Sequence, residues 1–310
     1  MILTITLNPS IDHTLFIDHF TVGDTNRIQR CETDAGGKGI NLSRVAHKLG
    51  RSTLASGFIG GPAGAEVLHV LVREGLRHRF QETKGESRSN FSVESAHDGS
   101  TTTLNARGPE ITPDEWEGFL SLLQTIAPEA TWVAMGGSIP PGVPSSAYQT
   151  ITERMHELGK LVLVDADGDP AKLALEAKPD MIKPNLKEAE RLVGRALPKL
   201  EDQIEATKEL RESLSDSGIA IITLGKDGAV MATPDQVLVG ESPVVEARST
   251  VGSGDSFLAG LLSKRDLGWI EAMKWGLAAG AATAMSDGAR IGTREDTEAL
   301  LSQAKVRELS

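Results

Sequence analysis

Residues 250–262 read Thr-Val-Gly-Ser-Gly-Asp-Ser-Phe-Leu-Ala-Gly-Leu-Leu, a glycine-rich loop that runs into an apolar helical pattern. The stretch 243–247, which contains two adjacent valines, comes before the loop and is expected to form a strand. Gly252 and Gly254 let backbone N–H groups approach a ligand, and a helix N-terminus has partial positive charge. This order of strand, loop and helix therefore predicts an anion site within an α/β fold.

The same alternation extends outward along the chain. Apolar runs without in-and-out alternation, such as 161–164 and 219–224, predict strands that are buried on both faces. Helical patterns separate such runs and are expected at 39–49, 63–74, 113–125, 145–158, 186–193, 200–216, 254–264, 270–285 and 294–305. We therefore predict one domain over residues 1–310, with a doubly wound, mostly parallel sheet covered by helices.

Two polar, strand-like stretches interrupt this alternation, at about 11–34 and 88–107. The second contains short β-like pieces around 88–95 and 100–105, joined by a turn at His97-Asp98-Gly99. We expect the two stretches to form a small separate sheet.

Composition excludes several classes of protein. The 310 residues have a net charge of −11 and only 4% aromatic residues, which disfavours a nucleic-acid binder. The single cysteine, Cys31, excludes an intramolecular disulfide framework and a cysteine-rich metal site. No apolar run is long enough to span a membrane, and residues 1–7 lack the features of a signal peptide. We therefore expect a cytoplasmic protein with no membrane and no nucleic-acid partner.

Asp255 is the candidate base of the anion loop. A carboxylate there could accept a proton from an attacking hydroxyl, beside backbone donors for a developing phosphoryl charge. Phosphoryl transfer to an alcohol needs this combination. The alternative is that Asp255 only caps the helix.

A second glycine-rich loop, 35–41, also comes before a helix. Its three glycines would let the chain wrap a polyol or a phosphate, to which Lys38 and Asn41 could donate hydrogen bonds. The loop does not fit a Walker A motif, because Glu32 and Gly39 occupy required positions, and Leu42 breaks a dinucleotide fingerprint. A glycine-rich helix start without a ligand is the alternative.

Two further loops follow predicted strands. In the segment 183–188, Asn185 and Glu188 have the spacing of a helix capping box, or could organise water and magnesium near nucleotide phosphates. The segment 223–228 by itself indicates only a tight turn.

These loops, in this order, resemble the phosphofructokinase B-type branch of the ribokinase-like carbohydrate kinases over essentially the whole chain. The residues that correspond to the two family signatures are 36–50 and 249–260. The segments 6–12, 85–88 and 137–142 resemble those of the hexose-phosphate kinases. The resemblance implies a Rossmann-like α/β domain with a small β-sheet lid from about 11–34 and 88–107, and a homodimer formed through the lid.

The resemblance also implies a role for each site residue. Asp255 would be the base, beside an anion hole of the Gly252, Ser253 and Gly254 amides. The sugar phosphate would be held by Asp12, Gly37, Lys38, Asn41 and Arg88. The residues that would bind ATP and Mg²⁺ are Lys183, Asn185, Glu188, Thr223, Gly225 and Gly228. Of these, Glu188 would be the metal ligand.

The chain departs from the family pattern in the lid, where Ser92 stands in place of a basic residue. We expect Arg27 or Arg107 to supply the missing positive charge. A lysine at position 38 is typical of the enzymes that act on fructose 1-phosphate or tagatose 6-phosphate. The segments 288–290 and 292–294, by contrast, resemble the corresponding segments of enzymes that act on a 6-phosphate. Fructose 1-phosphate is the favoured substrate, with fructose 6-phosphate and tagatose 6-phosphate as alternatives.

Two hypotheses for the function that are not a carbohydrate kinase remain. A sugar-phosphate sensor without catalysis would share the fold, but it leaves the intact Asp255 loop without a purpose. A nicotinamide-dependent oxidoreductase would share the sheet architecture, but its fingerprint is missing.

Overall fold

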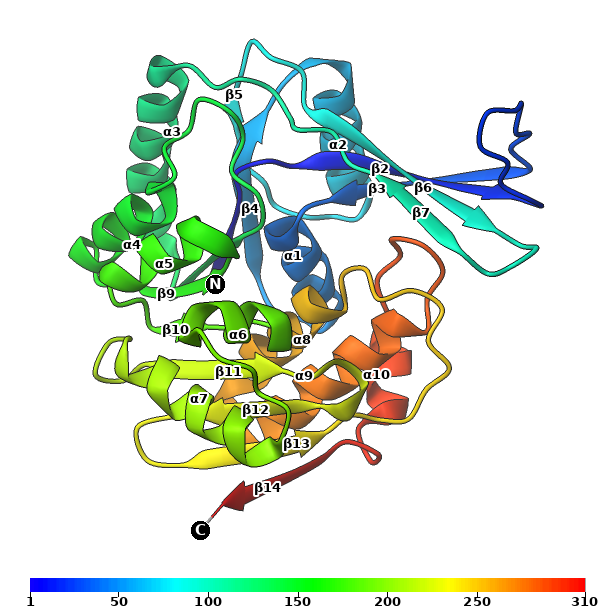
Figure 1. The fold of residues 1–310 in the computed structure, drawn as a ribbon. Coiled ribbons are helices and arrows are strands. Elements are labelled where there is room, and N and C mark those ends of the chain that lie inside the picture. The colour runs from blue at the N-terminus through cyan, green and yellow to red at the C-terminus, as the bar shows by residue number, and fades with distance from the viewer. Residues whose placement is uncertain (310) are drawn as a thin grey trace.

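The computed structural model describes residues 1–309, which form one large and one small sheet (Figure 1). The large sheet has ten strands in the order β14-β13-β12-β11-β10-β9-β8-β1-β4-β5. Their bounds are β1 Ile2–Thr6, β4 Thr53–Ile59, β5 Gln81–Glu82, β8 Trp132–Gly136, β9 Leu161–Asp165, β10 Met181–Ile182, β11 Ile219–Thr223, β12 Ala229–Ala232, β13 Val237–Glu241 and β14 Lys305–Leu309. Strands from β5 to β11 pair in parallel, and β12, β13 and β14 continue antiparallel, which confirms the mostly parallel sheet.

Helices cover both faces of this sheet. They are α1 Lys38–Lys48, α2 Gly61–Arg73, α3 Pro113–Ile126, α4 Ala147–Glu157, α5 Gly168–Glu176, α6 Leu186–Val193, α7 Leu200–Glu212, α8 Ser253–Lys264, α9 Trp269–Ala284 and α10 Arg294–Leu300. Within β1, Leu3 and Ile5 belong to the core under α3 and α4, whereas Ile2 belongs to the core under α1, α8 and α9. Burial on both faces explains why these strands are apolar throughout.

The small sheet has four strands in the order β3-β2-β6-β7 and projects from the large one (Figure 1). Its strands are β2 Ser10–Ile17, β3 Arg30–Gly36, β6 Arg88–Ser95 and β7 Thr101–Leu104. They come from the two stretches that interrupt the α/β alternation, so the predicted small sheet is confirmed. Ile11 and Ala35 anchor it in a core shared with α2.

Three local predictions were wrong. Residues 243–247 form no strand, since Val244 is 94% exposed and the sheet edge beside β13 is taken by β14. The helix expected at 294–305 ends at Leu300 and gives way to β14. Helix α5 was not expected at all. For the first two, the outcome depends on which segment pairs with the edge of β13, and local pattern does not contain that information.

The helices within residues 1–309 include none that is both long and apolar enough to cross a lipid bilayer.

Candidate functional site

A cleft of about 790 Å³ lies at the carboxyl ends of the parallel strands. Asp165 at the end of β9, Thr223 at the end of β11 and the N-terminus of α8 contribute to its wall. It brings together these residues predicted from the sequence: Lys38, Lys183, Asn185, Glu188, Thr223, Gly225, Gly228, Gly252, Ser253, Gly254 and Asp255. Segments that are far apart in the sequence therefore share one cavity.

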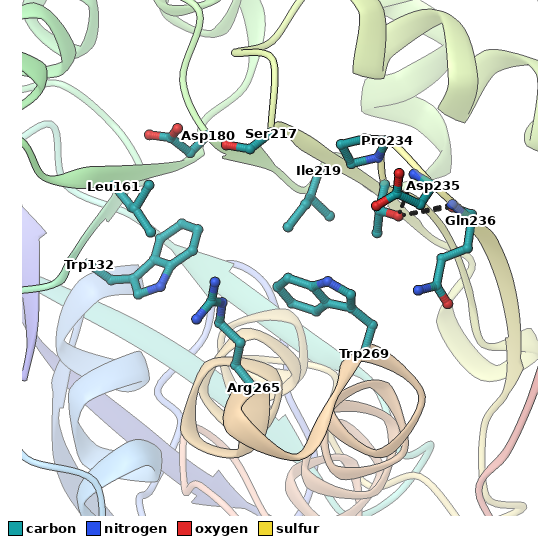
Figure 2. A pocket seen from close by; sticks show the side chains of 11 residues that line it. Trp132, Leu161, Asp180, Ser217, Ile219, Pro234, Asp235, Gln236, Arg265 and Trp269 are labelled. Carbon is teal, nitrogen blue, oxygen red and sulfur yellow. Dashed lines mark hydrogen bonds between the residues drawn. The ribbon is translucent and has the colours of Figure 1, made fainter.

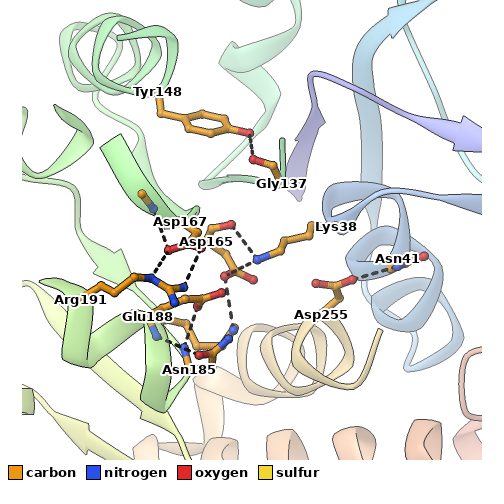
Figure 3. Close-up of polar contacts among 12 residues, drawn as sticks. Lys38, Asn41, Gly137, Tyr148, Asp165, Asp167, Asn185, Glu188, Arg191 and Asp255 are labelled. Carbon is orange, nitrogen blue, oxygen red and sulfur yellow. Dashed lines mark hydrogen bonds and ion pairs between the residues drawn. The ribbon is translucent and has the colours of Figure 1, made fainter. Parts of the chain in front are cut away.

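Asp255 occupies the first turn of α8 and is buried, with 7% of its surface exposed. The N-cap of this helix is Gly252, with no side-chain capping bond, so Asp255 is not the helix cap. Instead, Asn41 Nδ2 donates a hydrogen bond of 2.9 Å to Asp255 Oδ2 (Figure 3). This bond leaves the other carboxylate oxygen available to the cleft.

The pKa of Asp255 is raised to about 6. Burial is the largest cause, because it disfavours the charged carboxylate, and the negative charge of Asp165 adds to it. Lys38, the hydrogen bond from Asn41 and Lys183 act in the opposite direction. A carboxylate with this pKa is ionised at neutral pH yet basic enough to accept a proton in a transition state.

Asp165 is a site residue that the sequence analysis missed. Lys38 Nζ donates to Asp165 Oδ1 at 2.9 Å and to its backbone oxygen at 3.1 Å (Figure 3). Lys183 Nζ lies 3.4 Å from the same Oδ1. Burial would raise the pKa of Asp165, but the two lysines outweigh it and hold the pKa below its usual range. Its position directly after a buried strand was the only signal in the sequence.

The ammonium groups of the buried Lys183 and the half-buried Lys38 both belong to the cleft. Burial would lower the pKa of Lys38, but Asp165 and Asp255 raise it well above its usual value, so Lys38 is positively charged. The role of Lys38 in holding the sugar stays a prediction. Its Nζ donates to Asp165, and the charges of both Asp165 and Asp255 act on it.

The backbone around Gly252 adopts the conformation that an anion loop needs. Gly252 has φ +76°, a left-handed conformation that favours glycine. The first amides of a helix have no intrahelical acceptor, so those of Gly252 and Gly254 are free to bind an anion. The amide of Ser253 is the exception, because it donates to the Thr250 carbonyl at 3.3 Å. The Ser253 hydroxyl, however, is buried without a hydrogen-bond partner among residues 1–309.

Asn185 and Glu188 form the predicted capping box at the start of α6. The Asn185 amide donates to Glu188 Oε2 at 2.8 Å, and the Glu188 amide donates to Asn185 Oδ1 at 3.0 Å. Both residues also line the cleft, so capping and ligand binding are compatible. Within residues 1–309 no group of three or more His, Cys, Asp or Glu side chains could hold a metal by itself.

The small sheet contributes a second polar group. Asp12 Oδ1 accepts hydrogen bonds from Ser10 Oγ at 2.7 Å and from Asn90 Nδ2 at 2.9 Å, which fixes the carboxylate. The Arg88 guanidinium donates to the backbone oxygens of Asn8 at 3.2 Å and Ala106 at 3.1 Å. Gly37 joins this sheet to α1 with φ +116°, and a Cβ there would lie 2.4 Å from Thr6 Cγ2.

The two arginines expected to supply extra charge differ in position. Arg107 follows β7 and its backbone oxygen accepts from Asn8 Nδ2 at 2.9 Å, so it lies near Arg88. Arg27 lies in the exposed connection between β2 and β3, at the end of the hairpin away from Asp12 and Gly36. The hairpin thus places Arg27 away from Asp12 of its own chain, and the expectation that Arg27 or Arg107 supplies the missing charge stays a prediction.

Comparison with known proteins gives consistent matches over the full length. A model of the pfkB family of carbohydrate kinases matches residues 5–296. The chain is 34% identical over 311 residues to the 1-phosphofructokinase of Bacillus subtilis (strain 168), with 100% of both proteins covered. Phosphofructokinase-2 from Escherichia coli in complex with substrates and products aligns with a TM-score of 0.91 and 27% identity, covering 97% of this chain and 98% of that one. The tetrameric inhibited form of that enzyme aligns with a TM-score of 0.88 and 26% identity at the same coverage.

Proposed function

Because the chain belongs to the pfkB family of carbohydrate kinases, we propose that it transfers a phosphoryl group from ATP to fructose 1-phosphate and forms fructose 1,6-bisphosphate. The observation that carries this proposal is the buried Asp255, held by Asn41 beside the free amides at the start of α8. The similarity to a curated 1-phosphofructokinase over the full length supports the choice of substrate.

Asp255 is the base in this proposal. The C6 hydroxyl of the sugar phosphate loses its proton to the Asp255 carboxylate while its oxygen forms a bond to the γ-phosphorus of ATP. The bond from that phosphorus to the bridging oxygen breaks, and ADP leaves. Asn41 keeps one carboxylate oxygen occupied, so that the other is directed toward the hydroxyl.

The negative charge that develops on the transferred phosphoryl group meets fixed donors. The amides of Gly252 and Gly254 and the orphaned Ser253 hydroxyl are suited to bind it. Lys38 and Lys183 add positive charge, and Asp165 holds both ammonium groups in place. Since these donors are fixed before the reaction, little reorganisation accompanies the transfer.

Magnesium fits the carboxylates of this cleft. Mg²⁺ in kinases uses one or two protein carboxylates and completes its shell with phosphate oxygens and water. Glu188, which lines the cleft, matches that requirement, and Asp165 is the second carboxylate nearby. When bound with ATP, the ion would neutralise part of the phosphate charge.

The sugar phosphate would lie beneath the small sheet. Asp12 and Asn41 are suited to the sugar hydroxyls, and Arg88 and Arg107 to the phosphate already present on the substrate. A sheet that closes over the cleft would exclude water, which otherwise competes as phosphoryl acceptor. Arg27 could take part only from a second copy of the chain, in a homodimer formed through this lid.

Phosphorylation of a 6-phosphate is the second candidate function. The similarity to phosphofructokinase-2 from Escherichia coli solved in complex with fructose-6-phosphate favours it. A turnover panel of fructose 1-phosphate, fructose 6-phosphate and tagatose 6-phosphate with ATP and Mg²⁺ separates the candidates. We expect kcat/KM to be highest for fructose 1-phosphate, and a higher value for either 6-phosphate would overturn the assignment.

A further inference from the structure

A second cavity of about 220 Å³ lies at the opposite edge of the large sheet (Figure 2). Trp132 and Leu161, at the start of β8 and β9, form part of its wall, and Arg265 and Trp269 close another side. The ends of the same two strands, Gly136 and Asp165, lie at the catalytic cleft. A strand of five residues spans about 13 Å, so the two cavities lie at opposite ends of the same strands.

Two nitrogen donors in this cavity have no partner. The Trp132 side chain is 4% exposed, and its indole Nε1 forms no hydrogen bond within residues 1–309. The Nε of Arg265 is also buried and unpaired. Figure 2 shows the indole nitrogen on the side of the Trp132 ring that faces Arg265. Buried N–H groups almost always have an acceptor, so two orphans that face one another indicate a missing one.

Within residues 1–309 the Arg265 guanidinium forms no direct ion pair, although Asp180 and Asp235 line the same cavity. It lies 5.8 Å from the Trp132 ring centroid and 5.4 Å from that of Trp269. Cation–π contact stabilises the guanidinium but leaves its N–H donors in the ring plane free. An oxyanion is therefore the acceptor that satisfies both the charge and the donors.

The other residues that line the second cavity indicate what charge and size the bound anion should have. Asp180 and Asp235 also line the cavity, and Asp180 accepts hydrogen bonds from the Val162 amide and the Ser215 hydroxyl. The two carboxylates repel a multiply charged anion more strongly than a singly charged one. Leu161, Ile219 and Pro234 supply apolar surface. The volume is about seven times the share of one water in the liquid, which suits a small organic molecule.

We infer that this second cavity is a binding site for a small organic monocarboxylate, with its oxygens on Trp132 Nε1 and the Arg265 guanidinium and its apolar part against Leu161, Ile219 and Pro234. Helix α8 connects the cavity to the catalytic cleft, because Asp255 lies in its first turn and Arg265 directly follows its last. The inference concerns binding only and does not depend on which sugar phosphate is the substrate.

The indole N–H signals of the ¹⁵N-labelled full chain test the inference directly. The chain has four tryptophans, and Trp132→Phe identifies the signal of Trp132. We expect benzoate to move that signal saturably with a Kd of about 1 mM or below. Neutral benzamide, of the same size, is expected to leave it in place, and inorganic phosphate to bind at least tenfold more weakly.

Variants decide whether the shift reports this cavity. Arg265→Gln is expected to weaken benzoate binding at least tenfold, whereas Lys264→Gln, next to it on Trp275, keeps the wild-type Kd. If Arg265→Gln does not fold, Ser217→Phe, which fills the cavity from its rim and retains Arg265, is expected to abolish the shift. No shift with benzoate, an equal shift with phosphate, or an unchanged Kd in these variants would overturn the inference.

Discussion

Two buried aspartates in one cleft acquire opposite pKa shifts, and the difference arises from their nearest neighbours. Asp165 has two ammonium groups within 3.4 Å, which outweigh burial and lower its pKa. Asp255 accepts from a neutral amide and faces the charge of Asp165, so burial dominates and raises its pKa. One carboxylate is thus permanently ionised and holds the lysines, while the other is suited to exchange a proton.

Asp255→Asn separates activity from stability. Loss of a general base is expected to lower kcat by about 10²–10⁴-fold. The variant also removes a buried charge whose pKa is raised from 3.8 to about 6, which costs the wild type about 2–3 kcal/mol of unfolding free energy at neutral pH. Turnover assays and urea denaturation at pH 7.5 therefore should find a variant that is nearly inactive and more stable.

The sign of the stability effect follows from linkage. The folded protein holds the Asp255 proton more tightly than the unfolded chain, so the penalty is absent below about pH 4 and complete above about pH 6. The stability advantage of Asp255→Asn should grow across that window. Near-wild-type turnover in this variant, or an advantage that is independent of pH, would contradict the role assigned to Asp255.

The pH profile of kcat/KM tests the same residue without a substitution. If Asp255 must be ionised in the enzyme–ATP complex and keeps its pKa of about 6 there, kcat/KM for fructose 1-phosphate should fall below about pH 6, to roughly one tenth of its plateau at pH 5. Steady-state rates at saturating ATP and Mg²⁺ between pH 5 and 8 give this profile. A plateau that extends to pH 5 would mean that the step limiting kcat/KM does not need this base.

Arg88 is expected to act on the sugar phosphate alone. Its guanidinium is fixed by two backbone oxygens on the small sheet, away from the cleft that would hold ATP. Arg88→Ala should raise KM for the sugar phosphate by roughly 10–100-fold and leave KM for ATP nearly unchanged. Arg73→Ala, an exposed arginine on α2, serves as the control. Equal increases in both KM values would indicate that Arg88 instead holds the small sheet in shape.

At the scale of elements, the close packing of α8 against α9 positions the catalytic residue. A Cβ on Gly260 of α8 would lie 2.4 Å from the backbone oxygen of Trp275 on α9. Backbone atoms cannot yield as a side chain can, so only glycine allows the two helices this approach. The position of Asp255, one turn earlier on α8, depends on that contact.

Gly260→Ala tests the helix contact. The variant is expected to lower the free energy of unfolding by about 1–3 kcal/mol and to reduce turnover as α8 shifts. The matched control is Gly118→Ala in α3, where the new Cβ would meet only the flexible end of Gln81, and alanine favours the helix by up to about 1 kcal/mol. Urea denaturation of both variants checks this, and a Gly260→Ala protein as stable as the wild type would contradict it.

Elements with a strong local pattern could be predicted from the sequence. Elements whose place depends on which of several segments pairs with a free sheet edge could not. The buried strands β9 and β11 and the capping box at α6 were all correctly identified, because each is specified by adjacent residues. The edge strand β14 could not be, since its five residues have no distinctive pattern and pair only because β13 offers a free edge.

The candidate site divides in the same way. Glycine-rich loops at helix starts are visible in sequence, so the residues around Asp255 were found and the structure brings them into one cleft. Asp165 was missed because its part in the site depends on ion pairs with Lys38 and Lys183, which come from other loops and cannot be predicted from the residues next to Asp165. The outward position of Arg27 depends on the course of the β2–β3 hairpin, which no local motif reveals.

At the scale of the whole molecule, charge is divided along the chain. Residues 1–110 contain 12 Lys and Arg and 12 Asp and Glu, whereas the remaining 200 contain 20 and 31 and account for the net −11. The small sheet lies in the neutral part, where Arg88 and Arg107 can attract an anionic substrate. In the acidic part, backbone amides and the buried Lys183 provide local positive potential that the net charge does not reveal, and Lys38 reaches the same cleft from the neutral part.

The small sheet has an apolar outer row that we expect to form the homodimer contact. Phe91 and Leu104 are register partners on β6 and β7, exposed by 39% and 57%, and His13 of β2 stacks on Phe91 with ring centroids 5.1 Å apart. A dimer formed there would bury this row and could bring the outward Arg27 of one copy toward the other. The tetrameric form of the E. coli relative is consistent with association in this family.

Light scattering should give a dimer for the wild type and a monomer for the double variant Phe91→Ser, Leu104→Lys. Leu158→Lys at the C-cap of α4, which replaces a leucine exposed by 39% far from the lid, should remain dimeric. A monomeric wild type, or a dimer unaffected by the double variant, would exclude the lid as the contact.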